Sequence, residues 1–202
     1  MNRTDPATKA QLRRELRAEA QQHDAREREQ SSQAVCSQLG QKACYLKAQS
    51  VMFFAAMAEE LDLRPLAAQA LADGKQVAYP RWAEGSRQYE AAWVKNLEHA
   101  LVRGHWGILE PHGSCPRADL KRIDLILVPG VGFSLNGGRL GRGKGYYDRM
   151  LAEAGGLKCG VAFDWQITEV IPMEPRDVYL DCLLTPTRWQ VVSEAGANPP
   201  TG

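Results

Sequence analysis

The stretch that decides the fold of this 202-residue chain reads GGRLGRGKGYYD and occupies residues 137–148. It follows an apolar run at residues 123–128 and the chain-breaking pair Pro129-Gly130. Its five glycines let backbone N–H groups approach an anion without obstruction by Cβ atoms. The residues after Gly145 have helical character, so we expect the N-terminus of a helix to face the same anion. This order of strand, glycine loop and helix predicts a phosphate-binding site.

Two known glycine motifs do not describe this loop. From Gly138 it reads GxxxxGKG, which departs from the P-loop pattern because Gly145 replaces the Ser or Thr that would bind Mg²⁺. A dinucleotide fingerprint would follow the first strand of its unit and would need a ribose-binding acid further on. An exposed basic turn that contacts RNA remains as the alternative. The density of cations beside Asp148 favours the phosphate site.

Length and charge narrow the class of protein. We expect a single domain at residues 1–192 and a disordered tail at residues 193–202, which is rich in small residues. The 25 Lys and Arg residues nearly balance the 24 acids, so overall charge favours neither nucleic acid nor a membrane as a partner. The apolar runs are too short to span a bilayer and the N-terminus is charged, so we expect a cytoplasmic protein, with a monomer as the default.

Cysteine and histidine spacing does not predict a metal ribbon or a disulfide framework. The five cysteines are scattered without a CxxC pair, so we expect reduced thiols. His105, His112 and Cys115 do not match a standard zinc pattern.

Helical and apolar patterns alternate along the chain. Leu12, Leu16 and Ala20 share one face of a first helix, and a second helix buries Val35 and Leu39 and ends near Gly40 or Tyr45. A further helix is predicted at residues 63–72, and another from Tyr146 to the pair Gly155-Gly156. Strands are predicted at residues 51–57, 76–80, 88–94, 123–128, 158–163 and 181–185. The alternation predicts a three-layer α/β domain with a mostly parallel sheet.

Several polar and aromatic residues outside the loop are candidates for a site. Lys9 and Arg13 lie one helical turn apart and can hold one anion together, or they form a solvated face. Glu60 follows the strand at residues 51–57, where an acid serves either a ligand or the N-terminus of the next helix. Trp106, with Gly104 and Gly107 on either side, serves either as a platform for a flat ring or as a cover for the core.

Together these residues resemble the 5-formyltetrahydrofolate cyclo-ligase family, also called methenyltetrahydrofolate synthetase. The resemblance extends over nearly the whole chain except its C-terminal tail. It rests on Lys9-x-x-x-Arg13, Met57-x-x-Glu60, Tyr79-Pro80-Arg81, Trp106-Gly107-Ile108, and the segment from Pro129 to Asp148. The most specific part is RLGRGKGYYD at residues 139–148.

The resemblance implies a Rossmann-like fold of the ribose-5-phosphate isomerase and CoA transferase kind. It also implies conversion of 5-formyltetrahydrofolate to 5,10-methenyltetrahydrofolate, with ATP as co-substrate and Mg²⁺ as cofactor. ATP would phosphorylate the formyl oxygen, and the neighbouring folate nitrogen would then attack. Such phosphoryl transfer needs positioning and charge neutralisation, which the cations of the loop offer.

Residue roles carried over from the family fall into four groups. The expected ATP site comprises Lys9, Arg13, Arg139, Leu140, Gly141, Arg142, Gly143, Lys144, Gly145, Tyr146, Tyr147 and Asp148. The expected folate site comprises Phe54, Ala55, Met57, Glu60, Trp106 and Tyr147. Arg139, Arg142, Lys144 and Tyr147 are the expected catalytic residues. Asp148 and Asp177 are the expected Mg²⁺ ligands, with Asp181 as an alternative to Asp177.

Two other functions have distinct expectations. A folate- or nucleotide-binding regulator without turnover would bind formylfolate tightly and consume no ATP. An RNA-binding protein that uses Arg139, Arg142 and Lys144 would bind RNA with steep salt dependence.

Overall fold

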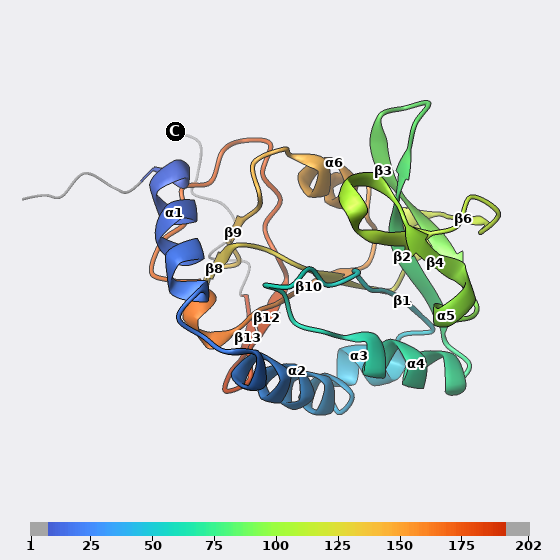
Figure 1. Ribbon diagram of the computed structural model, residues 1–202, viewed down its shortest axis with the longest axis horizontal. Coiled ribbons are helices and arrows are strands. Elements are labelled where there is room, and N and C mark those ends of the chain that lie inside the picture. The colour runs from blue at the N-terminus through green and yellow to red at the C-terminus, as the bar shows by residue number, and fades with distance from the viewer. Residues whose placement is uncertain (1–7, 193–202) are drawn as a thin grey trace, which may run out of the picture.

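The computed structural model describes residues 8–192, which form an α/β body around an eight-stranded sheet (Figure 1). The predicted tail at residues 193–202 lies outside this range, as do residues 1–7. The strand order in the sheet is β13-β12-β10-β7-β1-β2-β3-β6. Within the described range, no helix has the length and apolar character that a bilayer-spanning segment needs.

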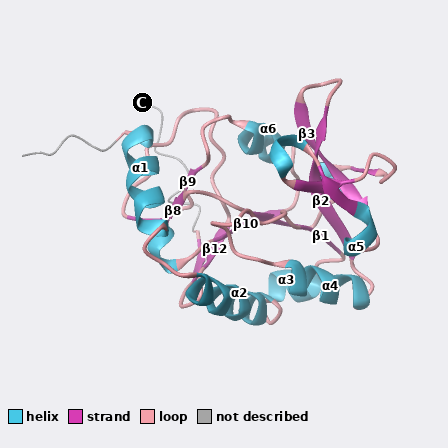
Figure 2. Ribbon diagram, in the orientation of Figure 1, coloured by secondary structure: helices cyan, strands magenta, loops and turns pink. Residues whose placement is uncertain are grey.

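The secondary structure is distributed along the whole described range (Figure 2). The helices are α1 (Lys9–Ala20), α2 (Ala25–Leu39), α3 (Ala43–Lys47), α4 (Arg64–Ala72), α5 (Leu97–Ala100) and α6 (Tyr146–Ala152). The strands of the large sheet are β1 (Ser50–Met52), β2 (Gln76–Ala83), β3 (Gln88–Val94), β6 (Arg117–Ala118), β7 (Leu125–Val128), β10 (Leu157–Val161), β12 (Cys182–Leu184) and β13 (Trp189–Val191). Smaller sheets contain β4 (Leu101–Arg103) with β5 (Leu109–Pro111), and β8 (Gly132–Ser134) with β9 (Arg139–Leu140) and β11 (Ile167–Thr168).

The centre of the large sheet is parallel and its edges are antiparallel. Strands β12, β10, β7, β1 and β2 pair in parallel, whereas β13, β3 and β6 are antiparallel to their neighbours. Parallel strands need crossover connections, and the helices supply them between β1 and β2 and between β7 and β10. The predicted mostly parallel α/β sheet is therefore confirmed.

Both faces of the sheet are buried, which explains the continuous apolar runs in its strands. Leu125 and Leu127 pack into one core cluster with residues of α2, α3 and α4, whereas Ile126 and Val128 pack into a second cluster with residues of α6. Successive side chains of a strand point to opposite faces, so a strand covered on both sides is apolar at every position. Figure 1 shows α2, α3 and α4 on one side of the sheet and α6 on the other. The predicted three layers are thus present.

Some predicted bounds were wrong. The strand predicted at residues 51–57 ends at Met52; the N–H of Phe53 still donates to the Ala78 carbonyl at 2.9 Å, and the chain then leaves the sheet. The helix predicted to close at Gly155-Gly156 ends at Ala152. The glycine loop predicted at residues 137–148 begins with a short strand, because β9 pairs with β8 in an antiparallel hairpin.

Candidate functional site

A cavity of about 290 Å³ opens at the carboxyl ends of the central strands. Its wall includes Phe54, which follows β1, Pro80 of β2, and Pro129-Gly130, which follow β7. Strands β1 and β7 are neighbours, yet the chain continues from β1 through α4 over one face and from β7 through α6 over the other. In open α/β sheets a ligand crevice forms where the direction of winding reverses in this way. The cavity lies at that switch point.

The glycine loop forms one side of the cavity. Gly141, Arg142, Lys144 and Gly145 all line it. Gly143 (φ 100°) and Gly145 (φ 66°) have left-handed backbone conformations that side-chain-bearing residues rarely adopt. Because α6 has only seven residues, its N-terminus alone does not make an anion site. The features that suit an anion are the cations and the backbone N–H groups of the loop.

Arg139, predicted as an ATP-binding and catalytic residue of the glycine loop, has a buried side chain. It lies in β9, is only 4% exposed, and its guanidinium donates to the Pro129 carbonyl at 3.3 Å and to Asp148 Oδ1 at 2.8 Å. Its Nε has no hydrogen-bond partner within the described residues. Arg139 thus holds the Asp148 carboxylate in place at the cavity wall, where both residues are found.

Arg142 and Glu60 join the predicted phosphate and folate sides directly. Arg142 Nη2 lies 3.1 Å from Glu60 Oε1, and the second Glu60 oxygen accepts from the Met57 N–H at 3.0 Å. The Glu60 side chain is 10% exposed. The alternative that Glu60 caps a helix is wrong, because the first turn of α4 begins at Arg64 and contains no acid. Glu60 instead closes a turn beside the cavity.

The first helix reaches the glycine loop from outside the cavity. Arg13 Nε donates to the Gly141 carbonyl at 2.8 Å, and its guanidinium lies against Gly143. Lys9 pairs with Asp177 and, at 3.2 Å, with Glu174. Burial disfavours the charge on Lys9, but the hydrogen bonds to these two carboxylates outweigh it and raise the pKa of Lys9 above its usual value. The structure thus brings Arg13 to the loop and holds Lys9 beside Asp177.

Leu140 has a different environment from the rest of the predicted ATP site. Its side chain is 1% exposed and packs with Leu12, Leu16 and Ile171. Only its backbone can take part in ligand binding. Its side chain instead packs α1 against β9, the strand with which the glycine loop begins.

The predicted metal ligands are held by different cations. Asp148 pairs with Arg139, whereas Asp177 pairs with Lys9 and accepts from the Glu174 N–H at 2.7 Å. Asp181 accepts from the Lys158 N–H at 2.7 Å and so joins the loop before β12 to β10. No group of three or more His, Cys, Asp or Glu side chains suited to a metal ion occurs within residues 8–192.

Aromatic rings form the opposite wall. Trp106 is 57% exposed and lies at the tip of the β4–β5 hairpin, so the alternative that it covers the core is wrong. Its ring centroid lies 5.5 Å from that of Tyr146 and 6.2 Å from that of Trp82. Trp106 has φ 57°, a strained conformation for a residue with a side chain. Strain of this kind is tolerated where packing or function fixes the ring.

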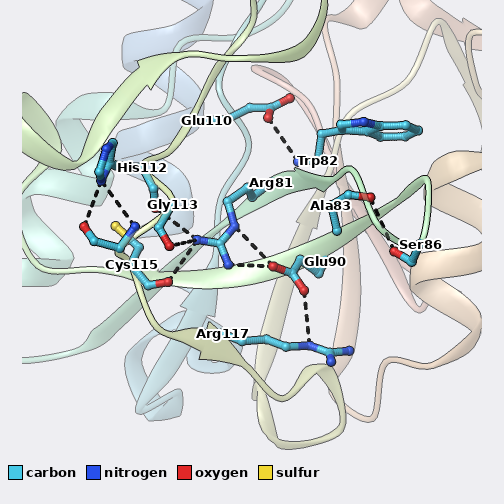
Figure 3. Close-up of polar contacts among 11 residues, drawn as sticks. Arg81, Trp82, Ala83, Ser86, Glu90, Glu110, His112, Gly113, Cys115 and Arg117 are labelled. Atoms are coloured by element: carbon cyan, nitrogen blue, oxygen red, sulfur yellow. Dashed lines mark hydrogen bonds and ion pairs between the residues drawn. The ribbon is translucent and has the colours of Figure 1, made fainter.

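A hydrogen-bonded cluster anchors the base of that hairpin (Figure 3). Arg81 of β2 donates to the carbonyls of His112 at 3.0 Å and Cys115 at 2.9 Å, and it pairs with Glu90 of β3. The Glu110 carboxylate accepts from the Trp82 N–H at 3.0 Å. These bonds fix the chain on the C-terminal side of β5 and thereby the position of Trp106.

Tyr147 lies in the same cavity between the two sides. Burial, together with the negative charge of Glu60, raises the pKa of its hydroxyl well above the usual range. The Arg139 guanidinium lies 5.6 Å from its ring centroid. Tyr147 therefore remains a neutral hydroxyl donor near the loop.

All six predicted folate residues line the cavity, and so do most residues of the predicted ATP site. Four residues of the predicted ATP site do not line it: Lys9, Arg13, Leu140 and Gly143. The predicted metal ligand Asp177 does not line it either. Sequence reasoning did not predict Pro80, Tyr89, Ile108, Leu109, Glu110, Pro129 and Gly130 as site residues. The period-two pattern of Tyr89, Ala91 and Trp93 on one face of β3 could have indicated Tyr89. Glu110 had no such signal, because its burial depends on how the hairpin docks.

Comparison with known proteins identifies the family to which this chain belongs. The 5-formyltetrahydrofolate cyclo-ligase family matches residues 5–186. The chain belongs to this family. The predicted family is therefore confirmed, and with it the prediction that the chain belongs to a group of enzymes.

Individual members of the cyclo-ligase family agree with this assignment over most of their length. The probable 5-formyltetrahydrofolate cyclo-ligase of Schizosaccharomyces pombe is 32% identical over 171 residues, which are 77% of this chain and 83% of that protein. The 5-formyltetrahydrofolate cyclo-ligase of Mus musculus is 28% identical over 189 residues, 88% of this chain and 93% of that protein. The NMR structure of Aquifex aeolicus 5,10-methenyltetrahydrofolate synthetase superposes with a TM-score of 0.83 at 33% identity, over 92% of this chain and 93% of that one.

Proposed function

We propose that this chain converts 5-formyltetrahydrofolate to 5,10-methenyltetrahydrofolate with the consumption of ATP. The observation that carries the proposal is one cavity lined on one side by Arg142 and Lys144 of the glycine loop and on the other by Glu60 and Trp106. Membership of the cyclo-ligase family supports it. Phosphoryl transfer from ATP to the folate requires that both substrates meet at such a junction.

The loop suits the first step, in which the formyl oxygen attacks the terminal phosphorus of ATP and ADP leaves. Arg142 and Lys144 neutralise charge on the transferring phosphoryl group, and the loop N–H groups hold its oxygens. Arg139 acts mainly by fixing Asp148, since its guanidinium is buried and already bonded to that carboxylate. Arg13, which bonds the loop carbonyl of Gly141, supports the loop from behind.

The other side of the cavity suits the pteridine ring of the folate. Glu60 accepts hydrogen bonds from ring N–H groups, while Phe54, Ala55 and Met57 provide apolar contact and Trp106 covers the ring. Tyr147, a neutral hydroxyl donor between the two sides, orients the reacting formyl group. The cavity volume is near the lower end of typical ligand pockets, so it suits the ring system while the tails of both substrates extend outside.

Mg²⁺ is part of the proposal, with Asp148 as its protein ligand. Mg²⁺ usually binds one or two carboxylates and completes its octahedron with waters and substrate phosphates. The Asp148 side chain lines the cavity, and only one of its oxygens is bonded to Arg139. Asp177 fits a second ligand less well, because it is not among the residues that line the cavity. When bound, the ion would neutralise ATP phosphate charge.

The proposal also covers the domain organisation, the oligomeric state and the cellular location of the protein. We assign residues 1–192 to one catalytic domain, which acts as a monomer in the cytoplasm. Size-exclusion chromatography with light scattering tests the oligomeric state, and a dimer mass would contradict it.

The experiment for the activity itself mixes purified protein with 5-formyltetrahydrofolate and MgATP. Formation of the methenyl product is followed by its near-ultraviolet absorbance, with ADP measured in parallel. Absorbance that grows in step with ADP supports the proposal. Tight formylfolate binding without ADP release would favour a regulator instead.

A further inference from the structure

Glu110 is a buried carboxylate at the cavity wall that the steps above do not use. It is 4% exposed, and one of its oxygens accepts from the Trp82 N–H at 3.0 Å (Figure 3). The other oxygen accepts from the Tyr89 hydroxyl at 3.1 Å. Neither donor carries a charge. Within the described residues, no cation lies in ion-pair contact with Glu110, whereas Glu60 and Asp148 each have an arginine partner.

The fold reserves space for this carboxylate. A Cβ atom on Gly104 would lie 2.5 Å from Glu110 Oε2 and 2.9 Å from Glu110 Cβ. Any side chain at Gly104 would therefore displace Glu110 from the wall. The absence of a side chain at Gly104, in the hairpin that carries Trp106, thus leaves room for the Glu110 side chain.

Aromatic rings surround the cavity beside Glu110. Tyr89, Trp106 and Tyr146 line the same cavity as the acid. The Tyr146 centroid lies 5.7 Å from that of Tyr89 and 5.5 Å from that of Trp106. Arg149 lies 4.9 Å from the Tyr146 centroid and takes one face of that ring. Aromatic faces beside an acid form an environment that stabilises cations.

The free-energy cost of burying the Glu110 carboxylate indicates that a ligand provides it with a partner. A carboxylate removed from water is costly unless a cation or several hydrogen bonds compensate it. Glu110 receives one hydrogen bond at each oxygen, although each oxygen can accept two. Proteins tolerate such underused charges mainly where function requires them. The missing partner would come from the cavity.

The proposed reaction supplies a cation at this stage. Phosphorylation of the formyl oxygen makes the formyl-bearing nitrogen iminium-like. Attack of the neighbouring nitrogen on the formyl carbon removes that charge, and the attacking nitrogen passes its proton to an oxygen of the phosphoryl group. The carbon–oxygen bond then breaks, and inorganic phosphate leaves with the electron pair. The product carries one positive charge shared by the two nitrogens of the new ring, whereas the formyl group was neutral.

We infer that Glu110, together with the rings of Tyr89, Trp106 and Tyr146, stabilises the positive charge that develops on the folate as the ring closes. This inference rests on the proposed function. Charge stabilisation that is stronger in the transition state than in the bound substrate accelerates the chemical step. Glu110 thereby favours the cationic product form over the neutral substrate.

The test compares the affinities of two ligands in the absence of ATP. 5,10-Methenyltetrahydrofolate and 5-formyltetrahydrofolate are titrated into wild-type protein and Glu110→Gln, in a buffer in which the methenyl compound persists. Wild type should bind the methenyl compound more tightly. Glu110→Gln should weaken binding of the methenyl compound about 10- to 100-fold and binding of the formyl compound less than about threefold. The reason is that the variant removes the carboxylate charge, which attracts the cationic methenyl compound but not the neutral formyl group. Single-turnover cyclisation should slow by a similar factor.

Three variants separate charge from structure. Glu84→Gln removes an exposed acid from the β2–β3 turn and should leave both affinities unchanged. Tyr89→Phe removes one hydrogen bond but keeps the charge, so the preference for the methenyl compound should remain. Glu110→Asp keeps the charge and should retain more of the preference than Glu110→Gln does.

Each contrary result overturns the inference without overturning the activity. Equal loss of both affinities in Glu110→Gln would assign the acid to ordinary ring recognition. A lower melting temperature with an unchanged affinity ratio would assign it to the hairpin alone. If Glu110→Gln does not fold, weaker binding of the methenyl than of the formyl compound by wild type would refute the inference. Absence of wild-type turnover would instead refute the proposed function.

Discussion

Replacement of Glu60 by Gln tests whether the two halves of the site are coupled. Arg142 lies 3.1 Å from the Glu60 carboxylate, whose side chain is only 10% exposed. ATP phosphates that draw Arg142 away would leave this carboxylate nearly buried without a cation. Folate N–H groups would then restore its partners. Each substrate should therefore strengthen binding of the other, by a factor in the typical range of about 5–150.

In Glu60→Gln the amide cannot form an ion pair with Arg142. The factor by which each substrate strengthens binding of the other should therefore fall close to one. Folate affinity should fall about 10- to 100-fold, since hydrogen bonds to a charged group contribute about 1.5–3 kcal/mol. ATP affinity in the absence of folate should stay the same or rise slightly, because Arg142 is released.

Isothermal titration of a non-hydrolysable ATP analogue with Mg²⁺, with and without 5-formyltetrahydrofolate, measures the coupling. Glu59→Gln is the matched control, because Glu59 is 51% exposed and lies 3.9 Å from Arg142. It should leave the coupling within about twofold of wild type, as exposed ion pairs contribute little. A marked loss of ATP affinity in Glu60→Gln, or an unchanged coupling factor, would refute the assignment of the two sides.

Three further predictions concern single residues. Arg142→Ala should cut turnover about 100- to 1000-fold and lower the melting temperature by only about 2–4 °C, because the side chain is 37% exposed and the loss of its ion pair with Glu60 costs about 1 kcal/mol; a melting temperature that falls far more than this would contradict the prediction. Asp148→Asn should raise the Mg²⁺ concentration needed for half-maximal turnover, and an unchanged Mg²⁺ requirement would rule Asp148 out as the ligand. Asp124→Asn should lower stability by about 1 kcal/mol at neutral pH, because the carboxylate joins β7 to β1 by accepting from the N–H groups of Gln49 and Ser50 and from the Ser50 hydroxyl. Partial desolvation would raise the pKa of Asp124, but the hydrogen bonds from Ser50 outweigh it and lower the pKa. The contribution of Asp124 to stability is therefore full above its unfolded pKa near 4, and it disappears as the pH falls through the lower folded pKa. Urea unfolding at several pH values tests this pH dependence.

The fold was predictable because the apolar pattern of each strand agrees with its burial in the sheet. Leu125, Ile126, Leu127 and Val128 form an unbroken apolar run, and both faces of β7 are indeed covered. The strand end at Met52 was not predictable in the same way. Phe53 and Phe54 are as apolar as the strand itself, and only the path of the chain into the cavity decides where pairing stops.

The candidate site was predictable where glycines and charges are local in sequence. Gly143 and Gly145 adopt the left-handed conformations for which glycine is suited. The environment of Arg139 was not predictable, because its burial depends on β8 and on Asp148 nine residues later. Glu110 illustrates the same limit, since its contacts come from β2 and β3 rather than from its own segment.

The central claim is that this cavity joins phosphoryl transfer from ATP to ring closure of the folate. One measurement tests it most directly: the near-ultraviolet absorbance of the methenyl product and the release of ADP, followed together after purified protein meets 5-formyltetrahydrofolate and MgATP. We predict one ADP for each methenyl product, with no product when ATP is omitted. Product that forms at the same rate without ATP, or no product at ample protein concentration, would contradict the account.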